Sequence, residues 1–418
     1  MKKFYQCISI FLTIILCFSG CGGKTQIETG GRGQATEEVT SQFQTGINQF
    51  SYQIFEQLDN GENLFISPYS IAIAISMLDN GADGQTKSEI ERMLGITDLE
   101  KWNACVKYYM SQNKEEQAKL LTANSLWLSD SLTLSADAET DFFQPVEKNY
   151  EAEKIQMNLS GEEARNQVNG WVSEHTEHMI EQLLTQQLDP RTEMLILNAV
   201  YFKGEWKEKF EKENTVKDNF YGKDKTSKIE FMCRNNTSSR YINKDGITAV
   251  ELPYGNENIV MDILLPTEET GDICKLFSEL SDKEKSDFLK ELSHSEEEKL
   301  GALMIPKFRM EYGVKNIKEA LKALGMKRAF EQGAADGSGA AEFSKIAPDL
   351  YADEVLHKAK IEVDEEGTKA AAVTAIEMRT KSCPEIFVAN RPFLFVIRDR
   401  ANDIILFMGS VQNLEEEK

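Results

Sequence analysis

The stretch that decides the fold runs from Asp364 to Pro384 and reads DEEGTKAAAVTAIEMRTKSCP. In an extended strand, successive side chains point to opposite faces, so every second residue shares a face. One face then carries only uncharged side chains, namely Thr368, Ala370, Ala372, Thr374, Ile376 and Met378. The charges between Lys369 and Lys381 all fall on the other face. The first face can therefore be buried in a sheet without placing an ion in a low dielectric.

This segment is nevertheless a poor strand to nucleate. Residues 369–372 read KAAA, which have small side chains and low strand propensity, and Gly367 stands at the entry, where the backbone can pivot. An alanine-rich helical turn or an edge strand of an enzyme explains the stretch alone equally well. The flanking sequence decides between these interpretations, because residues 355–363 alternate as a strand and residues 387–398 are largely apolar.

The segments VLHKAKIEVDEEGTKAAA (355–372), FVANRPFLFVIRD (387–399) and ILFMGSV (405–411) resemble the serpin family strongly. NLFISPYSIAIAISML (63–78) with GADGQTKSEI (81–90), and TEMLILNAVYFKGEWKEKF (192–210), share this resemblance. Because the matching stretches lie about three hundred residues apart, one domain is expected to span the chain. A secreted hydrolase with only a serpin-like C-terminal segment is the alternative, and the distribution of the matches argues against it.

The resemblance implies an α+β serpin fold with a large central mixed β-sheet, additional sheets, surrounding helices and an exposed reactive-centre loop. Apolar spacing predicts an amphipathic helix over residues 42–58. Residues 63–95 predict a short strand, a turn at Ser67-Pro68, a buried helix from Ser70 and a further helix capped at Thr86. Residues 249–266 and 301–330 predict strands followed by a helix.

The N-terminus predicts export. Residues 1–21 combine two lysines, an apolar run and small residues before Cys21, which is typical of a secretory signal. The ending FSGC resembles a bacterial lipobox, which implies cleavage and lipidation at Cys21 and a protein anchored to a membrane at the bacterial cell surface or envelope. Simple secretion is the alternative. Residues 22–40 are expected to be a flexible tether and residues 41–414 the serpin domain.

By resemblance, a hinge and a scissile bond are assigned to the C-terminal loop. The hinge comprises Glu365, Glu366, Gly367, Thr368, Lys369, Ala370, Ala371, Ala372, Val373 and Thr374. Lys369 departs from the acidic residue common at its position, but its side chain is expected to face solvent. The reactive bond is assigned to Lys381-Ser382, with Arg379 as the competing basic residue. Cys383 is either an exposed thiol or an incidental residue beside that bond.

The resemblance also assigns two polar sites on the main sheet. Ser67, Ser70, Asn198 and His357 correspond to the shutter near its centre, and Trp206 corresponds to the breach at its top. A hydrogen-bonded core histidine is the more usual explanation of His357, and both interpretations can hold at once. A surface ion pair between Lys307 and Glu365 is expected at the base of the hinge, where such a pair contributes about 0 to 1 kcal/mol.

The sequence lacks the short motifs of common enzymes. There is no P-loop, HExxH, GxSxG or paired CxxC pattern, so the protein is not expected to be an enzyme or to need a cofactor. His175 and His178 could share a helix face, yet no third ligand is suitably spaced, and a polar surface pair is expected rather than a metal site. The net charge of −22 disfavours nucleic acid or heparin-like partners.

The resemblance to serpins implies a monomeric suicide inhibitor, and Lys381 before the assigned bond predicts a trypsin-like serine protease as its target. In the family, the protease is trapped as an acyl-enzyme while the cleaved loop inserts into the sheet. A lysine before the scissile bond suggests a trypsin-like target, whose specificity pocket holds a carboxylate. A papain-like cysteine protease as target, or a non-inhibitory serpin that acts as a binding or structural protein, remain alternatives.

Overall fold

The computed structural model describes residues 37–112, 118–255, 257–333, 339–352, 355–367 and 385–416. These residues belong to a unit that runs from Ala35 to Lys418. The expected signal peptide with Cys21, most of the tether, the hinge from Thr368 onward and the reactive bond lie outside the described residues. Within the part of the chain that is described, no helix is both long and apolar enough to cross a membrane.

The largest sheet has the strand order β1-β14-β13-β8-β7-β6-β9-β12, with β5 paired to β6. Its strands are β1 Leu64–Ile66, β5 Val216–Tyr221, β6 Thr226–Lys244, β7 Ile247–Pro253, β8 Ile259–Pro266, β9 Glu297–Pro306, β12 Glu385–Val388, β13 Phe393–Asp399 and β14 Ile404–Val411. The sheet is mixed, because β12 runs parallel to β9 whereas β13 pairs antiparallel with both β8 and β14. Every residue of β8, β13 and β14 is buried, which explains their nearly continuous apolar sequences.

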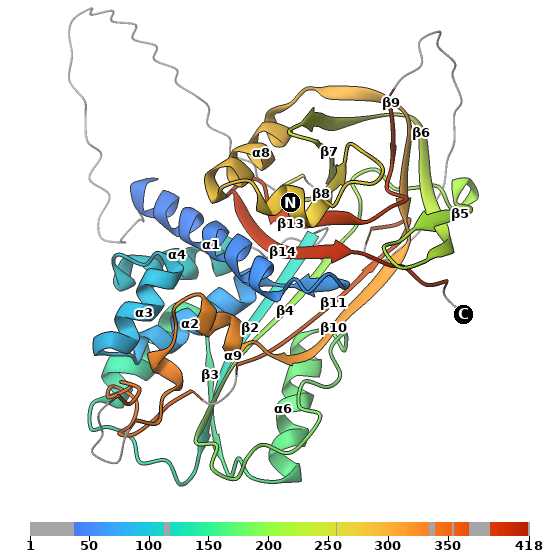
Figure 1. The fold of residues 1–418 in the computed structure, drawn as a ribbon. Coiled ribbons are helices and arrows are strands. Elements are labelled where there is room, and N and C mark those ends of the chain that lie inside the picture. The colour runs from blue at the N-terminus through green and yellow to red at the C-terminus, as the bar shows by residue number, and fades with distance from the viewer. Residues whose placement is uncertain are drawn as a thin grey trace, which may run out of the picture. The chain divides into compact units, whose positions relative to one another are not determined.

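Two smaller sheets lie beside it and carry the site. One has the order β3-β2-β4, with β2 Ala118–Ser129, β3 Glu153–Met157 and β4 Met194–Gly204. The other pairs β10 Phe308–Asn316 with β11 Leu356–Val363. β11 alternates between buried and half-buried residues, as the period of two predicts. Figure 1 shows β2, β4, β10 and β11 crossing the middle of the domain.

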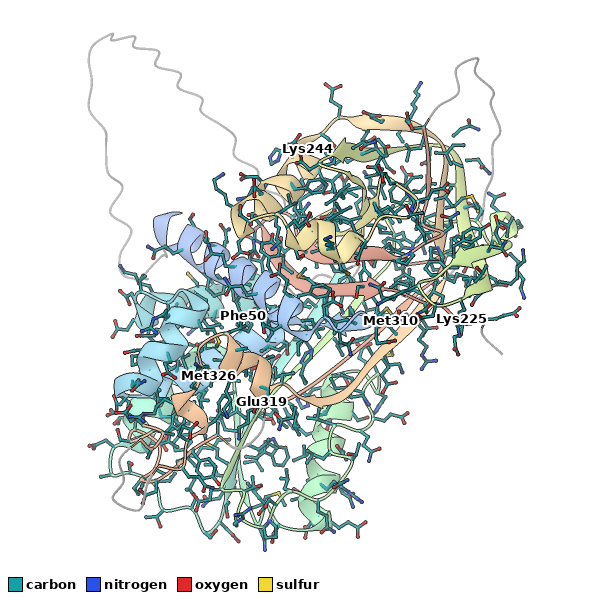
Figure 2. The ribbon with its side chains drawn as sticks, viewed as in Figure 1. Phe50, Lys225, Lys244, Met310, Glu319 and Met326 are labelled. Carbon is teal, nitrogen blue, oxygen red and sulfur yellow. The ribbon has the colours of Figure 1, made fainter. Side chains whose placement is uncertain are left out.

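Helices cover these sheets. They are α1 Glu37–Leu58, α2 Pro68–Asn80, α3 Gly84–Leu94, α4 Leu99–Gln112, α5 Gln144–Tyr150, α6 Glu162–His175, α7 Ile273–Ser278, α8 Asp282–His294 and α9 Lys318–Ala323. Phe50 of α1 and Met326 after α9 are fully buried among them, whereas Lys225 and Lys244 lie at the edge of the domain (Figure 2). Helices and sheets therefore form an α+β domain, in agreement with the predicted fold class.

Three predicted helix starts are wrong. α1 begins at Glu37, inside the expected tether. Backbone hydrogen bonds extend the helix beyond its first apolar residue, and acidic side chains near its N-terminus stabilise it through the helix dipole. α2 begins at Pro68 rather than Ser70, and the Ser67 hydroxyl caps it by accepting from the amide of Ser70. α3 begins at Gly84 without a side-chain cap of its own, and Thr86 lies inside it.

The backbone amides in the first turn of α3 find their hydrogen-bond acceptor in a distant part of the chain. A carboxylate oxygen of Glu342 accepts hydrogen bonds from the amides of Gln85 and Thr86, and the hydroxyl of Thr86 accepts one from the amide of Glu342. Local sequence therefore suggests Thr86 as a cap, whereas a residue far along the chain performs this function.

Candidate functional site: the hinge anchor, the shutter and the cavity between β4 and β11

Trp206 joins the end of β4 to the end of β11. Its indole Nε1 donates to the carbonyl of Asp364 at 2.9 Å, and its amide donates to the carbonyl of Glu366 at 3.0 Å. The indole is buried and stacks on the ring of Tyr254, with 4.4 Å between centroids and 14° between planes. The amide of Phe210 adds a bond of 2.8 Å to the carbonyl of Glu365. The first residues of the expected hinge are thus held against the residue assigned to the breach.

The side chains of Glu365 and Glu366 anchor the same turn. Lys307 Nζ lies 3.4 Å from Oε1 of Glu365, so the ion pair expected from the resemblance is present. The hydroxyl of Thr215 donates to the same oxygen at 2.8 Å, and Lys212 Nζ lies 2.8 Å from Oε1 of Glu366. Glu365 is only 4 % exposed, however, so its pair with Lys307 is not the surface pair that was expected.

The electrostatics of this turn favour an ionised Glu365. Burial alone would raise the pKa of this carboxyl, but the hydrogen bond from Thr215 and the charge of Lys307 outweigh it and hold the pKa below its ordinary value. Burial raises the pKa of Asp364, and the neighbouring carboxylates of Glu366 and Glu365 raise it further. The turn therefore concentrates negative charge that Lys307 and Lys212 balance.

Gly367 lies at a sharp bend of the backbone, where the sequence predicts that the chain bends or pivots. Its φ is +117°, and residues with a β-carbon rarely adopt this backbone conformation. A β-carbon at this position would lie 2.4 Å from the carbonyl oxygen of Gly204 and 2.5 Å from the amide nitrogen of Trp206. The hinge backbone therefore approaches β4 so closely that only glycine fits.

The structure brings the four residues assigned to the shutter together. His357 on β11 accepts from the amide of Ser67 through Nε2 at 3.1 Å, and the Ser67 hydroxyl donates to the carbonyl of Leu406 at 2.8 Å. The Ser70 amide donates to the hydroxyl of Ser67, and the Ser70 hydroxyl donates to Oδ1 of Asn198 on β4. The N-terminus of α2 therefore links β4 to β11 through hydrogen bonds.

His357 is neutral in this setting. Complete burial lowers its pKa to about 4. Because Nε2 accepts a hydrogen bond from an amide, the proton of the neutral ring lies on Nδ1. The two interpretations of His357 are therefore compatible, since a hydrogen-bonded core histidine also belongs to the polar cluster that links the two strands.

The polar cluster extends beyond the four residues that the resemblance assigns to the shutter. Nδ2 of Asn198 donates to Oδ1 of Asn124 on β2 at 2.7 Å, and Nδ2 of Asn124 donates to the carbonyl of Tyr150 at 2.6 Å. The Tyr150 hydroxyl donates to Oδ1 of Asn103 at 2.7 Å, and that side chain bonds Asn80 at the end of α2. Asn124 within the apolar strand LLTANSLWL was the available signal, because a buried amide needs partners.

A cavity of about 540 Å³ lies between the two small sheets. β4 lines it from Met194 to Val200, β11 contributes residues 356–358, and α2 contributes an apolar face from Ser70 to Leu78. The segment after α6 covers part of it, and Lys358 Nζ donates to the carbonyl of Gln182 in that segment at 3.0 Å. β4 and β11 belong to different sheets, and the cavity lies between them. The backbone bonds from Trp206 and Phe210 to Glu366 and Glu365 join the residues that follow the two strands.

The expected histidine pair is placed differently from the prediction. His175 is the last residue of α6, whereas His178 lies beyond the helix with φ +64°, so the two do not share a helix face. The Nδ1 of His178 is 2.9 Å from the hydroxyl of Ser173. Within the described ranges, no three His, Cys, Asp or Glu side chains are arranged to hold a metal ion.

Similarity to known proteins covers the whole described unit. The family model described as Serpin (serine protease inhibitor) matches residues 45–414. An uncharacterized serpin-like protein of Thermococcus kodakarensis is 33% identical over 379 residues, which cover 88% of this chain and 84% of the relative. Iripin-2 of Ixodes ricinus is 34% identical over 382 residues, which cover 88% of this chain and 92% of the relative.

The solved structures give the same answer. The native state of tengpin, a thermophilic serpin, superposes with a TM-score of 0.80 at 29% identity, covering 92% of this chain and 96% of that chain. The latent state of tengpin gives a lower TM-score of 0.75. Members of this family are in general protease inhibitors rather than enzymes. The family model, the relatives and the shared fold together establish that this chain belongs to the serpin family.

Proposed function

We propose that this serpin inhibits a trypsin-like serine protease by suicide trapping, in which cleavage of its loop is followed by insertion of the loop between β4 and β11. One observation carries the proposal. The hinge turn, residues 364–367, is clamped between the C-terminal ends of these two strands, and a cavity begins a few residues before those ends, at Val200 of β4 and Lys358 of β11. A strand that continues from Gly367 toward the shutter would enter that cavity.

The sequence that follows Gly367 suits such an insertion. Its uncharged face, from Thr368 to Met378, would face the apolar surface of α2, while the charges would face solvent. The non-inhibitory alternative is less favoured, because bulky or charged inward hinge residues or a proline would block entry, and the inward hinge positions hold only Thr368, Ala370, Ala372 and Thr374.

Insertion of the loop as a strand gains backbone hydrogen bonds and buries methyl groups, and these gains oppose the conformational entropy cost of ordering the loop. Thr368 to Lys381 would extend about 46 Å as a strand. Some ten new ladder bonds at about 0.5 to 1.5 kcal/mol each, with buried methyl groups, give on the order of 10 kcal/mol before the entropy cost. Such a gain becomes available only when cleavage frees one end of the loop.

The covalent step is assigned to Lys381-Ser382. The serine hydroxyl of the protease attacks the carbonyl carbon of Lys381, the bond to Ser382 breaks, and Ser382 leaves as a new amino terminus after accepting a proton. The carbonyl of Lys381 remains bound to the protease as an ester. Cleavage after Arg379 would shorten the tether to the protease and weaken trapping, and a papain-like protease would form a thioester at the same carbonyl.

The exported placement is part of the same proposal. The segment from Met1 to Cys21 supports export, and the lipobox-like FSGC supports a bacterial lipoprotein anchored through Cys21, with secretion as the alternative. The polar segment after Cys21, residues 22–36, would hold a monomeric domain away from the headgroups and leave its loop accessible.

The proposal is tested by mixing the soluble domain, residues 37–418, with trypsin. We expect a covalent complex that survives boiling in denaturing gel electrophoresis, and mass spectrometry should identify a released peptide that starts at Ser382. Cleavage without any complex would contradict trypsin as the target. If the cleaved protein also melts at the same temperature as the intact one, loop insertion itself is refuted.

A further inference from the structure

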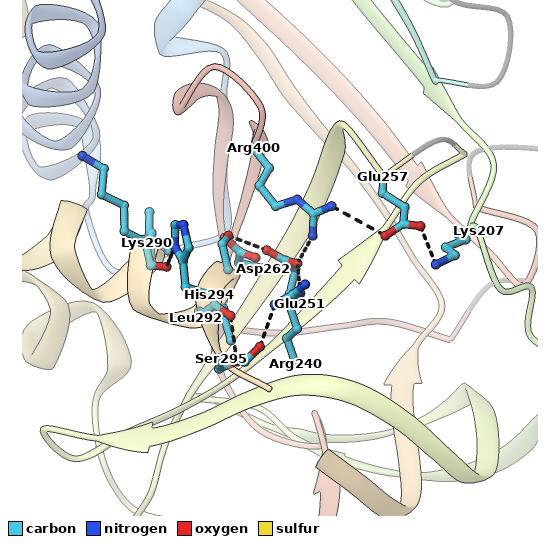
Figure 3. A network of polar contacts seen from close by, with 12 residues as sticks. Lys207, Arg240, Glu251, Glu257, Asp262, Lys290, Leu292, His294, Ser295 and Arg400 are labelled. Atoms are coloured by element: carbon cyan, nitrogen blue, oxygen red, sulfur yellow. Dashed lines mark hydrogen bonds and ion pairs between the residues drawn. The ribbon is translucent and has the colours of Figure 1, made fainter. Parts of the chain in front are cut away.

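Glu257 holds the residue that follows the breach tryptophan. Lys207 Nζ lies 2.5 Å from Oε1 of Glu257, and Nη2 of Arg400 lies 3.6 Å from its other carboxylate oxygen. The hydrogen bond from Lys207, supported by the charge of Arg400, outweighs partial burial and holds the pKa of Glu257 below its ordinary value. Figure 3 shows Glu257 between these two cations, so the carboxylate bridges the end of β4 and the segment after β13.

The turn that carries Glu257 is also bound to the breach through its backbone. This turn connects β7 to β8. The amide of Lys207 donates to the carbonyl of Pro253 at 2.9 Å, and the amide of Gly255 donates to the carbonyl of Glu205 at 2.8 Å. Tyr254, in the same turn, provides the ring on which Trp206 stacks. Displacement of this turn would therefore move the wall against which the hinge rests.

Arg400 connects Glu257 to a buried network in the large sheet. Nη1 of Arg400 lies 2.7 Å from Oε1 of Glu251, which is 1 % exposed. The other oxygen of Glu251 accepts from Arg398 at 3.2 Å, and Arg398 Nε lies 2.5 Å from Asp262. These residues lie on β7, β8 and β13 beneath α8. Glu257 thus ties the end of β4 to a fully packed part of the domain.

The backbone conformation at position 257 is unfavourable for glutamate. Its φ is +75°, in the left-handed region that residues with a β-carbon adopt at a cost. Glycine would suit this turn better. The geometry of the turn therefore does not explain the glutamate, whereas its two ion pairs do.

We propose that Glu257 is a positioning residue of the breach, which acts through Lys207 to hold the end of β4 against the hinge and so limits how readily β4 and β11 part. The inference rests on the proposed function, in which the strands part to admit the loop. The side chains of Lys207 and Glu257 are 40 % and 41 % exposed, so salt should screen their attraction. Parting of the strands should therefore respond to ionic strength through this pair.

The test measures opening in the uncleaved protein without any protease. Hydrogen–deuterium exchange, read by mass spectrometry of peptides spanning residues 204–211, reports on the amides of Trp206 and Phe210, which are bonded to the hinge. Glu257→Gln and Glu257→Gly should each accelerate exchange about two- to five-fold. Salt at about 1 M should accelerate exchange in the wild type more than in the variants, because only the wild type loses the Lys207–Glu257 attraction, whereas the pair of Lys212 with Glu366 is screened in all of them.

Glu291→Gln is the matched control. The side chains of Glu291 and Lys244 form an ion pair at 2.6 Å and are 51 % and 45 % exposed. The Glu291→Gln variant therefore loses a similarly exposed ion pair, but one that lies away from the breach. Its exchange at residues 204–211 should equal that of the wild type. Unchanged exchange in both Glu257 variants overturns the proposal, as does equal acceleration in the control. Slower exchange in Glu257→Gly would show that the turn backbone, not the carboxylate, governs opening.

This outcome is independent of whether the protein traps a protease. Loss of a covalent complex in the wild type refutes the proposed function without affecting the exchange data. Conversely, a normal complex in the wild type with unchanged exchange in the variants refutes only the role of Glu257.

Discussion

The indole Nε1 of Trp206 donates to the backbone carbonyl of Asp364 at 2.9 Å, and this bond connects two strands that belong to different sheets. A side chain that follows β4 thereby satisfies a carbonyl at the end of β11. The hinge begins directly after that carbonyl. Whatever loosens this connection should therefore also loosen the hinge.

Trp206→Phe should weaken the hinge anchor. Phenylalanine retains much of the stacking on Tyr254 but leaves the Asp364 carbonyl without its donor, which costs about 1 to 3 kcal/mol. Urea unfolding should report the loss, and hydrogen exchange in residues 364–367 should increase. Trp171→Phe is the control, because Trp171 also loses a bond from Nε1, to Glu153 at 2.9 Å, but lies on α6. Equal exchange in both variants would contradict the proposed connection.

Gly367→Ala should disrupt the turn between β11 and the hinge. The new β-carbon would lie 2.4 Å from the carbonyl oxygen of Gly204, and φ is +117°. We expect a loss of about 2 to 4 kcal/mol, measured by urea unfolding, because strain and backbone overlap add. Gly161→Ala separates the two causes, since Gly161 has φ +105° but nothing lies within 4 Å of its β-carbon. The claim of close approach fails if both substitutions cost the same.

Glu365→Gln should destabilise the native state by about 1 to 2 kcal/mol at pH 7, because a buried ion pair loses one partner. The pKa of Glu365 is lowered in the folded protein. Its ionised form therefore contributes stability above the unfolded pKa of about 4.3, and this contribution is lost as the pH falls through the folded pKa. Denaturant unfolding of both proteins should show a difference at pH 7 that shrinks below about pH 4. A difference that is independent of pH would exclude the carboxylate as its cause.

His357 should make stability fall on acidification between about pH 6.5 and 4. Its folded pKa is about 4, below the unfolded value of about 6.5, so between these pH values the imidazole is protonated in the unfolded chain and neutral in the folded protein. The loss should reach up to about 3 kcal/mol at the acid end. His357→Gln keeps an acceptor for the amide of Ser67 but does not titrate. Denaturant unfolding at pH 4.5 and 7.5 should therefore show a smaller decrease for the variant, and an equal decrease would locate the effect elsewhere.

Lys381→Ala should abolish the covalent complex with trypsin, because the side chain that fits an acidic specificity pocket is lost. Arg379→Ala should leave the complex intact and reduce the fraction of protein that is cleaved without trapping. Gel electrophoresis at fixed ratios of inhibitor to trypsin measures both quantities. The assignment of the scissile bond is reversed if Arg379→Ala, rather than Lys381→Ala, removes the complex.

The sequence by itself predicted the strand that became β11 and the bend at Gly367, and the fold class followed from the resemblance to serpins. Alternating side chains in 355–363 predict β11, and Gly367 at the end of that strand predicts a bend, because both are local properties of the backbone. The resemblance to serpins selected Ser67, Ser70, Asn198 and His357, although these residues lie up to 290 positions apart along the chain.

Only the tertiary structure decided which polar groups satisfy one another. The burial of Glu365, the extension of the shutter through Asn124 to Tyr150, and the bridge from Lys207 through Glu257 to Arg400 all join segments that are distant in sequence. Local sequence specifies strands and turns because backbone preferences act over a few residues. Burial, pKa and hydrogen-bond partners depend on which surfaces meet when the chain packs, and they become defined only in the folded domain.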